Sequence, residues 1–173
     1  MITLDDLKKI CPQTKPSVLT PYVEPLNDAM YEFDINNPQR EAMFIAQVAH
    51  ESGGFNYTRE LSSGEQYQGR KDLGDIDPGI GAWTKGRGLI EITGVDNYKK
   101  ASAYFGLDFM FDPEQLEQPD ISSRVAAWFW KEHGLNELAD KGDFLRITKI
   151  INGGTNGYAD RQAYLQRAQG VIV

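Results

Sequence analysis

The chain is poor in the residues that hold metals or form disulfides, since its 173 residues include one cysteine, Cys11, and two histidines, His50 and His133. A single cysteine cannot close an internal disulfide, so the fold does not depend on an oxidising compartment, and Cys11 is expected to be a buried thiol. These residues supply too few ligands for a typical catalytic zinc site. We therefore predict no metal and no other cofactor.

Long apolar runs and an excess of positive charge are absent as well. No stretch is long enough to span a bilayer, and "MITLDDLKKI" carries acidic residues where a signal peptide would carry basic ones. We expect a protein made in a cytoplasm without stable membrane insertion. The formal charge of -7 argues against a nucleic-acid partner. A local basic cleft is still compatible with this charge, and its candidate residues are Arg59, Arg70, Lys85 and Arg87.

The composition is that of a folded protein, with 40% hydrophobic and 11% aromatic residues and no shift along the chain that would mark a second unit. We predict a single catalytic domain over residues 1–173, acting as a monomer. Caps and breakers predict helices in the segments that begin near Thr3, after Pro25, at Pro38, near Asp96, at Pro119 and on both sides of Gly153. Residues 55 to 88 are rich in glycine and turns, and predict irregular structure with at most a short β-hairpin.

The helix expected from Pro38 to Gly53 is apolar around nearly its whole circumference, which places it at the centre of the fold. Glu51 lies near its end, and Glu60 follows nine positions later. On a straight helix these residues would lie about 13 Å apart, but Gly53 and Gly54 allow the chain to turn back. Two carboxyl groups, one protonated and one ionised, are what glycoside hydrolysis needs. The spacing alone favours the plainer alternative, an arginine salt bridge for Glu51 and a surface position for Glu60.

The segment "KGRGLIEITGVDNYKK" adds polar groups to this picture. Its glycines allow a close approach of the backbone, the Thr93 hydroxyl is suited to holding a water molecule, and Asn97 is suited to binding an amide or a sugar hydroxyl. A buried turn with a locally bonded Thr93 is an equally good interpretation of this segment by itself.

Four motifs occur in one order: "AHESGGF", "GRGLIEITGVDNY", "AAWFWKEHGLNELAD" and "INGGTNGYADRQAYLQR". Together they resemble the family 19 glycoside hydrolases, and in particular the phage and prophage endolysins with a chitinase-like, lysozyme-related fold. The resemblance covers a catalytic core from about residue 38 to 173, preceded by N-terminal helices over about 1–36. It implies a mainly α domain with a central cleft.

The resemblance also implies roles for individual residues. Glu51 corresponds to the general acid, Glu60 to the general base and Thr93 to the residue that positions the attacking water. The residues implied to bind substrate, or to line the cleft and hold its acids in place, are His50, Asn97, Tyr98, Asn152, Arg161 and Arg167. The implied mechanism is inverting, with the two carboxyl groups roughly 6.5 to 9.5 Å apart. Burial at the end of an apolar helix is expected to keep Glu51 protonated.

Glu91 is a departure from the family pattern, which has glutamine after "GRGLI". It is a third acid near the cleft, counted here with the substrate-binding residues, and a rival to Glu60 for the role of base. A salt bridge from Glu91 to Arg87 or to a late arginine is the preferred interpretation.

The resemblance implies a peptidoglycan hydrolase that cuts the β-1,4 bond between N-acetylmuramic acid and N-acetylglucosamine. Such a lysin accumulates in the bacterial host cytoplasm and reaches the cell wall in the periplasm after a holin permeabilises the membrane. The alternatives are a chitinase acting on N-acetylglucosamine polymers, and a wall-binding module that has lost its chemistry.

Overall fold

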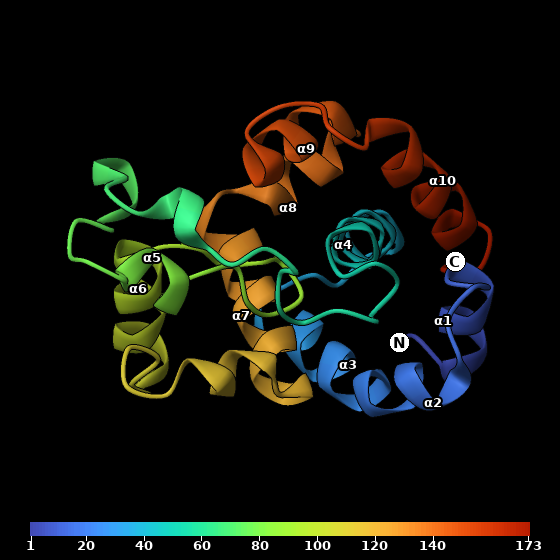
Figure 1. The fold of residues 1–173 in the computed structure, drawn as a ribbon. Helices are drawn as coiled ribbons and strands as arrows, with labels where there is room; N and C mark the ends of the chain where they lie inside the picture. The colour runs from blue at the N-terminus through green and yellow to red at the C-terminus, as the bar shows by residue number, and fades with distance from the viewer.

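Residues 1–173 are all described in a computed structural model, and their regular structure is helical (Figure 1). The α-helices are α1 (Leu4–Ile10), α2 (Pro16–Leu19), α3 (Val23–Glu32), α4 (Pro38–Glu51), α5 (Ile80–Trp83), α6 (Val95–Phe105), α7 (Pro119–Glu132), α8 (Leu135–Asp140), α9 (Phe144–Asn152) and α10 (Tyr158–Gln169). Short 3-10 helices occupy η1 (Thr20–Tyr22), η2 (Glu65–Tyr67), η3 (Lys71–Leu73) and η4 (Pro113–Glu117). The predicted mainly α architecture is confirmed.

The N-terminal caps predicted from the sequence are present in the structure. Thr3 accepts a hydrogen bond from the backbone nitrogen of Asp6 and caps α1, and Asn37 caps α4 with Pro38 at its first position. Two boundaries differ from the prediction. Helix α3 begins before Pro25, because proline is tolerated in a first turn whose N–H groups have no helical partner. The last part of the chain also contains a further helix, α8, ahead of the two that were expected.

Helix α4 runs through the middle of the molecule (Figure 1). Every residue from Ala42 to Ala49 is buried, as its apolar circumference predicts. Helices α8 and α10 pack against it, and α7 contributes an edge-to-face contact between Trp130 and Phe44. Helix α4 is therefore held on several sides, so the position of its last residue, Glu51, is well defined.

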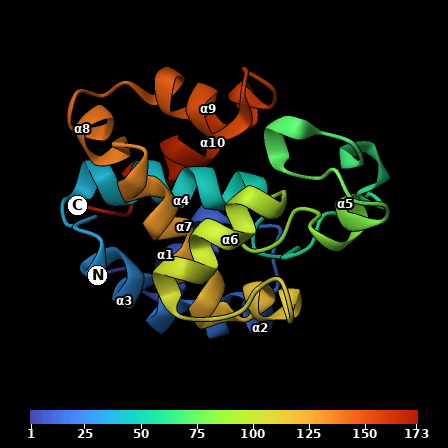
Figure 2. The ribbon, with the colours of Figure 1, turned by 90° about the vertical axis from the view of Figure 1, so that its left-hand side faces the viewer.

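The segment from about residue 55 to 94 projects to one side of this helical body, together with α5 and α6 (Figures 1 and 2). Helix α6 joins it to the body, since the ring of Phe105 packs against Trp128 of α7. Two isolated β-bridges, Arg59 with Arg87 and Arg87 with Ile92, take the place of the short hairpin that the sequence allowed. They bring residues 58–60 beside residues 86–92. No helix combines the length and the apolar character that crossing a bilayer requires.

Candidate active site

The end of α4 turns sharply, and this turn directs the chain from Glu51 toward Glu60. Ser52 caps the helix, and Gly53 and Gly54 follow with positive φ angles of 56° and 70°. Their backbone nitrogens donate back to the last turn of α4, to the carbonyls of His50 and Ala49. Glycine is favoured at such positions because it has no Cβ to clash. The predicted reversal of the chain after Glu51 is present.

Glu51 lies beside a buried arginine. The Nη2 atom of Arg161 is 2.6 Å from Glu51 Oε1, in an ion pair whose angle is poor for a hydrogen bond. Arg161 is fully buried, and its Nη1 donates to Gln47 Oε1 at 2.5 Å. The purely apolar surroundings predicted for Glu51 are thus wrong, and the salt bridge that the sequence left open is present.

Glu60 is held by four hydrogen-bond donors. Its Oε2 accepts from the Gly86 backbone nitrogen at 2.7 Å and from the Tyr67 hydroxyl at 2.9 Å. Its Oε1 accepts from Gln66 Nε2 at 3.1 Å and from the hydroxyl of Ser62. Several donors together stabilise the ionised form of a carboxyl group. These contacts fix the orientation of the Glu60 carboxyl group, so Glu60 is not an ordinary mobile acid on the surface.

Gly86 lies where Glu60, Glu91 and Thr93 come together. A Cβ atom placed on Gly86 would lie 2.6 Å from Glu60 Oε2, 3.2 Å from Glu91 Cβ and 3.4 Å from Thr93 Oγ1. The contact with Glu60 is reinforced by backbone pairing, since Glu60 N donates to Gly86 O at 3.0 Å. The extended segment after Lys85 therefore brings Thr93 close to Glu60, although 33 positions separate them in the sequence.

Glu91 adopts a left-handed backbone conformation, with φ at 52°, at the tip of the turn between Arg87 and Ile92. Burial and the negative charges of Glu51 and Glu60 raise its pKa to about 7. These two charges act on Glu91 only because both groups lie near it, so the three glutamates share one electrostatic environment. The predicted salt bridge from Glu91 to Arg87 is wrong, because Arg87 pairs with Glu117 at 3.0 Å.

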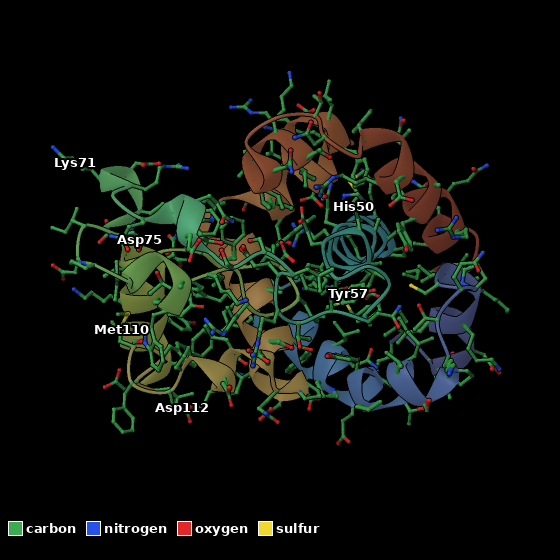
Figure 3. The ribbon with its side chains drawn as sticks, viewed as in Figure 1. His50, Tyr57, Lys71, Asp75, Met110 and Asp112 are labelled. Atoms are coloured by element: carbon green, nitrogen blue, oxygen red, sulfur yellow. The ribbon has the colours of Figure 1, made fainter.

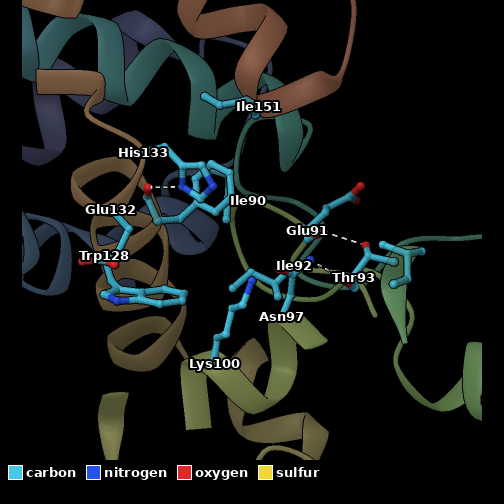
Figure 4. A pocket seen from close by; sticks show the side chains of 12 residues that line it. Ile90, Glu91, Ile92, Thr93, Asn97, Lys100, Trp128, Glu132, His133 and Ile151 are labelled. Carbon is cyan, nitrogen blue, oxygen red and sulfur yellow. Dashed lines mark hydrogen bonds between the residues drawn. The ribbon is translucent and has the colours of Figure 1, made fainter. Parts of the chain in front are cut away.

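A pocket of about 440 Å³ opens beside these groups (Figure 4). Glu91, Thr93 and Asn97 line one part of it, and residues of η3, α6, α7 and α9 line much of the rest. The remaining lining residues are Leu73, Ile90, Ile92, Lys100, Trp128, Phe129, Glu132, His133 and Ile151. Half of the lining residues are hydrophobic and half are polar, and apolar surface combined with a few placed polar groups is typical of a small-molecule or sugar site. No group of three or more His, Cys, Asp or Glu side chains is arranged to hold a metal ion.

Comparisons with known proteins identify the family of this arrangement. The chain is 34% identical over 157 residues to a glycosyl hydrolase family 19 domain-containing protein of Haemophilus influenzae, matching 72% of this chain and 76% of that protein. The chain belongs to glycoside hydrolase family 19. No family model matches it. Endochitinase At2g43620 of Arabidopsis thaliana is 35% identical over 114 residues, which are 65% of this chain and 38% of that longer protein.

Solved structures show the same fold. Chitinase C from Streptomyces griseus superposes with a TM-score of 0.78 at 20% identity, covering 99% of this chain and 92% of that chain. A bacterial family 19 chitinase gives 0.79 at 18% identity, with 99% and 94% covered. The predicted family 19 chitinase-like fold is confirmed, and the helices and 3-10 helices of this family 19 glycoside hydrolase form no sheet.

Two residues predicted to contact the substrate or the acids lie elsewhere. Tyr98 is fully buried, and its hydroxyl donates to Lys85 O at 2.6 Å and accepts from Arg87. A substrate at the surface cannot reach it, so Tyr98 supports the segment that carries Thr93. Arg167 donates to Ile10 O at 2.6 Å. It therefore fastens α10 to α1 and does not hold Glu51.

His50, Asn97 and Asn152 lie near the site, and the contacts of His50 and Asn97 are with other protein groups. His50 lies between α4 and α10, with its Nδ1 2.6 Å from Asp160 Oδ2 (Figure 3). Asn97 lines the pocket and donates to Thr93 O. Asn152 ends α9 directly after Ile151, a pocket residue, and its Oδ1 is buried without a hydrogen-bond partner. Substrate binding by these three residues stays a prediction.

The basic cleft considered from the sequence is not formed, because acidic or backbone partners occupy all four residues. The partners are Glu114 and Glu117 for Arg59, Asp72 for Arg70, the Ser62 carbonyl for Lys85, and Glu117 for Arg87. The cation that lines the pocket is Lys100, which lies outside the proposed set.

Sequence reasoning also missed the residues that support the site. Gln47 holds Arg161 and donates to Thr148 Oγ1 at 2.8 Å. The sequence did indicate its importance, since Gln47 is the one polar residue in the apolar stretch from Ala42 to Ala49, and a buried amide must find partners. Tyr67 gave no such signal, because only the tertiary fold brings its hydroxyl to Glu60.

Proposed function

We propose that this family 19 glycoside hydrolase degrades peptidoglycan by hydrolysing the β-1,4 bond between N-acetylmuramic acid and N-acetylglucosamine. The supporting observation is that Glu60 and Thr93 meet at Gly86, next to a pocket that Thr93 and Glu91 line, and that Glu51 is close enough to Glu91 for its charge to act there. Glu51 protonates the leaving oxygen, Glu60 takes a proton from the attacking water, and the Thr93 hydroxyl positions that water. The reaction inverts the anomeric centre, with the two carboxyl groups roughly 6.5 to 9.5 Å apart.

The ion pair with Arg161 is compatible with an acid role for Glu51. Arg161 fixes the direction of the carboxyl group through a buried network that includes Gln47. A sugar that enters the pocket displaces water, and repulsion between the charges of Glu51 and Glu60 becomes stronger in the drier site. One guanidinium cannot balance both negative charges there, so substrate binding favours uptake of the proton that the acid then donates to the leaving oxygen.

One basic side chain of the pocket, Lys100, beside the acids Glu91 and Glu132, supports peptidoglycan over chitin. Lys100 extends from α6 into the pocket and takes part in no ion pair (Figure 4). Chitin is uncharged, whereas the lactyl group of N-acetylmuramic acid carries a stem peptide with free carboxylates. An ammonium group in the pocket therefore has a complementary partner only on peptidoglycan.

A chitinase acting on N-acetylglucosamine polymers is the second candidate. It is favoured by the similarity to the endochitinase of Arabidopsis thaliana, of which the chain covers only 38%. Mass spectrometry of products from both polymers separates the two functions. Peptidoglycan fragments with reducing muramic ends are expected. Release from chitin alone would instead support the chitinase, and 1,6-anhydro ends would identify a lytic transglycosylase.

The role of the acid is tested with Glu51→Gln, which is isosteric but cannot donate a proton to the leaving oxygen. We expect lysis of outer-membrane-permeabilised cells to fall by at least about 100-fold, the usual contribution of a general acid. The folded state is checked by circular dichroism. The exposed Glu65→Gln serves as the matched control, and lysis by folded Glu51→Gln at the wild-type rate would exclude Glu51 as the acid.

Substrate charge is tested with Lys100→Gln. We expect a loss of roughly 3-fold to 10-fold in kcat/KM on peptidoglycan, which corresponds to about 1 kcal/mol of lost charge pairing. Cleavage of uncharged N-acetylglucosamine oligomers should change much less. Lys99→Gln, next to it on α6 but outside the pocket, is the control. Equal losses on both substrates would remove the charge argument for peptidoglycan.

We further propose the biological role of a phage-type lysin. The protein would accumulate in the host cytoplasm as a monomer and reach the wall when a holin opens the membrane. This role is supported by the resemblance of the sequence motifs to endolysins. It is tested by expression in bacteria with and without a holin, where lysis only in the presence of the holin is expected.

A further inference from the structure

Glu91 differs from the other two glutamates in what surrounds its carboxyl group. Glu51 has the guanidinium of Arg161, and Glu60 has four hydrogen-bond donors. The carboxyl group of Glu91 has no ion pair and no hydrogen-bond donor. Arg87 forms its ion pair with Glu117 instead, and Arg161 forms its ion pair with Glu51. A carboxylate without a partner beside two others is disfavoured electrostatically.

The backbone of Glu91 is also held in a costly conformation. A non-glycine residue in the left-handed region is strained by the clash of its Cβ with the backbone, and such strain is concentrated at functional sites. Here the turn is closed by a hydrogen bond from Glu91 N to Gly88 O, and Glu91 O accepts from Thr93 Oγ1 at 2.9 Å. The result is that the side chain lines the pocket and is kept out of the protein core (Figure 4).

We propose that Glu91 works as a neutral carboxylic acid whose hydroxyl donates a hydrogen bond to the bound sugar, and that its ionisation lowers hydrolysis above neutral pH. A protonated carboxyl group presents one donor and one acceptor, as a glutamine amide does. Ionisation releases the proton to solvent, removes the donor and adds a third negative charge beside Glu51 and Glu60. The proposal rests on the proposed glycosidase function for its effect on activity.

Charges from every neighbouring element bear on this ionisation. The groups around Glu91 are Glu51 of α4 with Arg161 of α10 behind it, Glu60 and Tyr67 of the preceding segment, Lys100 of α6, and Glu132 and His133 at the end of α7. The largest effect is burial, followed by the charges of Glu51 and Glu60, and together they raise the pKa of Glu91 to about 7. Lys100 lines the same pocket but contributes nothing to this shift.

The neutral state is tested directly by carboxyl carbon NMR of the protein labelled at glutamate. The Glu91 signal is assigned by its loss in Glu91→Gln, or in Glu91→Asp if the first variant does not fold. A titration midpoint near 7 is expected. A midpoint below about 5, the range of an ordinary glutamate, would overturn the proposal. This readout uses the free protein, so it gives its answer even if neither glycan proves to be the substrate.

The effect on function is tested by the pH dependence of kcat/KM on peptidoglycan. For the wild type, the neutral fraction of a group with a pKa of about 7 falls about tenfold between pH 6 and pH 8, and activity should fall with it. Glu91→Gln should lose this decrease. Histidine ionises in the same range and His133 lines the same pocket, so His133→Gln is the control, which should keep the decrease. An unchanged alkaline decrease in Glu91→Gln would refute the proposed role.

Discussion

Glu51, Glu60 and Glu91 are chemically identical side chains that the fold places in three different surroundings. Glu51 faces a buried cation, Glu60 faces four donors, and Glu91 faces other carboxyl groups. At the residue scale, these surroundings give three identical side chains different properties, and they raise the pKa of Glu91 to about 7. The division of roles therefore depends on a few contacts, of which the hydrogen bond from Gly86 to Glu60 is the easiest to disturb.

Gly86→Ala tests this contact. The added methyl group would lie 2.6 Å from Glu60 Oε2 and would push the carboxyl group out of position. Displacement of a catalytic base by about 1 Å is expected to lower kcat by roughly 100-fold while the protein still folds. Activity is compared with Gly170→Ala, where the nearest atom is 3.4 Å away. If Gly86→Ala retained full activity, the position of Glu60 would not matter for catalysis.

At the scale of elements, the site depends on how α10 lies along α4. Arg161 of α10 reaches Glu51 and Gln47 of α4, and Asp160 reaches His50. The two helices approach closely at Gly157, the residue before α10, where φ is 70° and the imidazole of His50 covers the position of a side chain. A shift of α10 would therefore move Arg161 away from Glu51, the proposed acid.

Gly157→Ala should show this coupling. The methyl group would collide with His50, in addition to the strain of alanine at a positive φ, so we expect a loss of about 2 to 4 kcal/mol in the free energy of unfolding. Gly153→Ala is a matched control, because Gly153 has a similar φ of 75° but open space around it. It should lose only about 1 kcal/mol. Equal losses by denaturant unfolding would show that the helices are not in contact there.

At the scale of the whole molecule, the net charge of -7 and the distribution of acids set the response to pH. Glu91 has a raised pKa, so the folded state binds its proton more tightly than the unfolded state does between about pH 4.5 and pH 7. Its stabilising contribution is present at low pH and is lost as the pH rises through about 7. The contribution of Asp140 to stability depends on pH in the opposite direction, because hydrogen bonds from Arg40 and Asn37 lower its pKa to about 2. Its stabilising contribution is present at neutral pH and is lost as the pH falls toward 2.

Thermal unfolding of Glu91→Gln should therefore differ from that of the wild type in a pH-dependent way. Near pH 8 the free energy of unfolding of the variant should exceed that of the wild type by roughly 1 to 2 kcal/mol, after allowance for screening by solvent in the pocket. This difference corresponds to a rise of about 2 to 8 °C in Tm. Near pH 4 the gain should vanish. Asp140→Asn is the contrasting control, because it should lower Tm at neutral pH and approach the wild type as the pH falls toward 2. A pH-independent difference for Glu91→Gln would contradict the linkage.

The sequence by itself determined the local features and the family motifs. Caps at Thr3 and Asn37 and the break at Gly53 act through neighbours a few residues away, so their effects follow from spacing. The central position of α4 follows from its apolar circumference, because such a helix must be surrounded by other elements. The order of the motifs then indicated the family that the comparisons show.

Only the tertiary structure decided how the charged and hydroxyl groups pair. From the sequence we expected Arg87 to pair with Glu91 and Arg167 to lie in the acid site. In the folded protein Arg87 pairs with Glu117, and Arg167 donates a hydrogen bond to α1. The partner of Glu51 is Arg161, 110 positions away in the sequence. Spacing predicts contacts within one helix, whereas an ion pair between distant segments depends on which faces meet when the core forms. For the same reason the lack of a partner for Glu91 was visible only in the folded molecule.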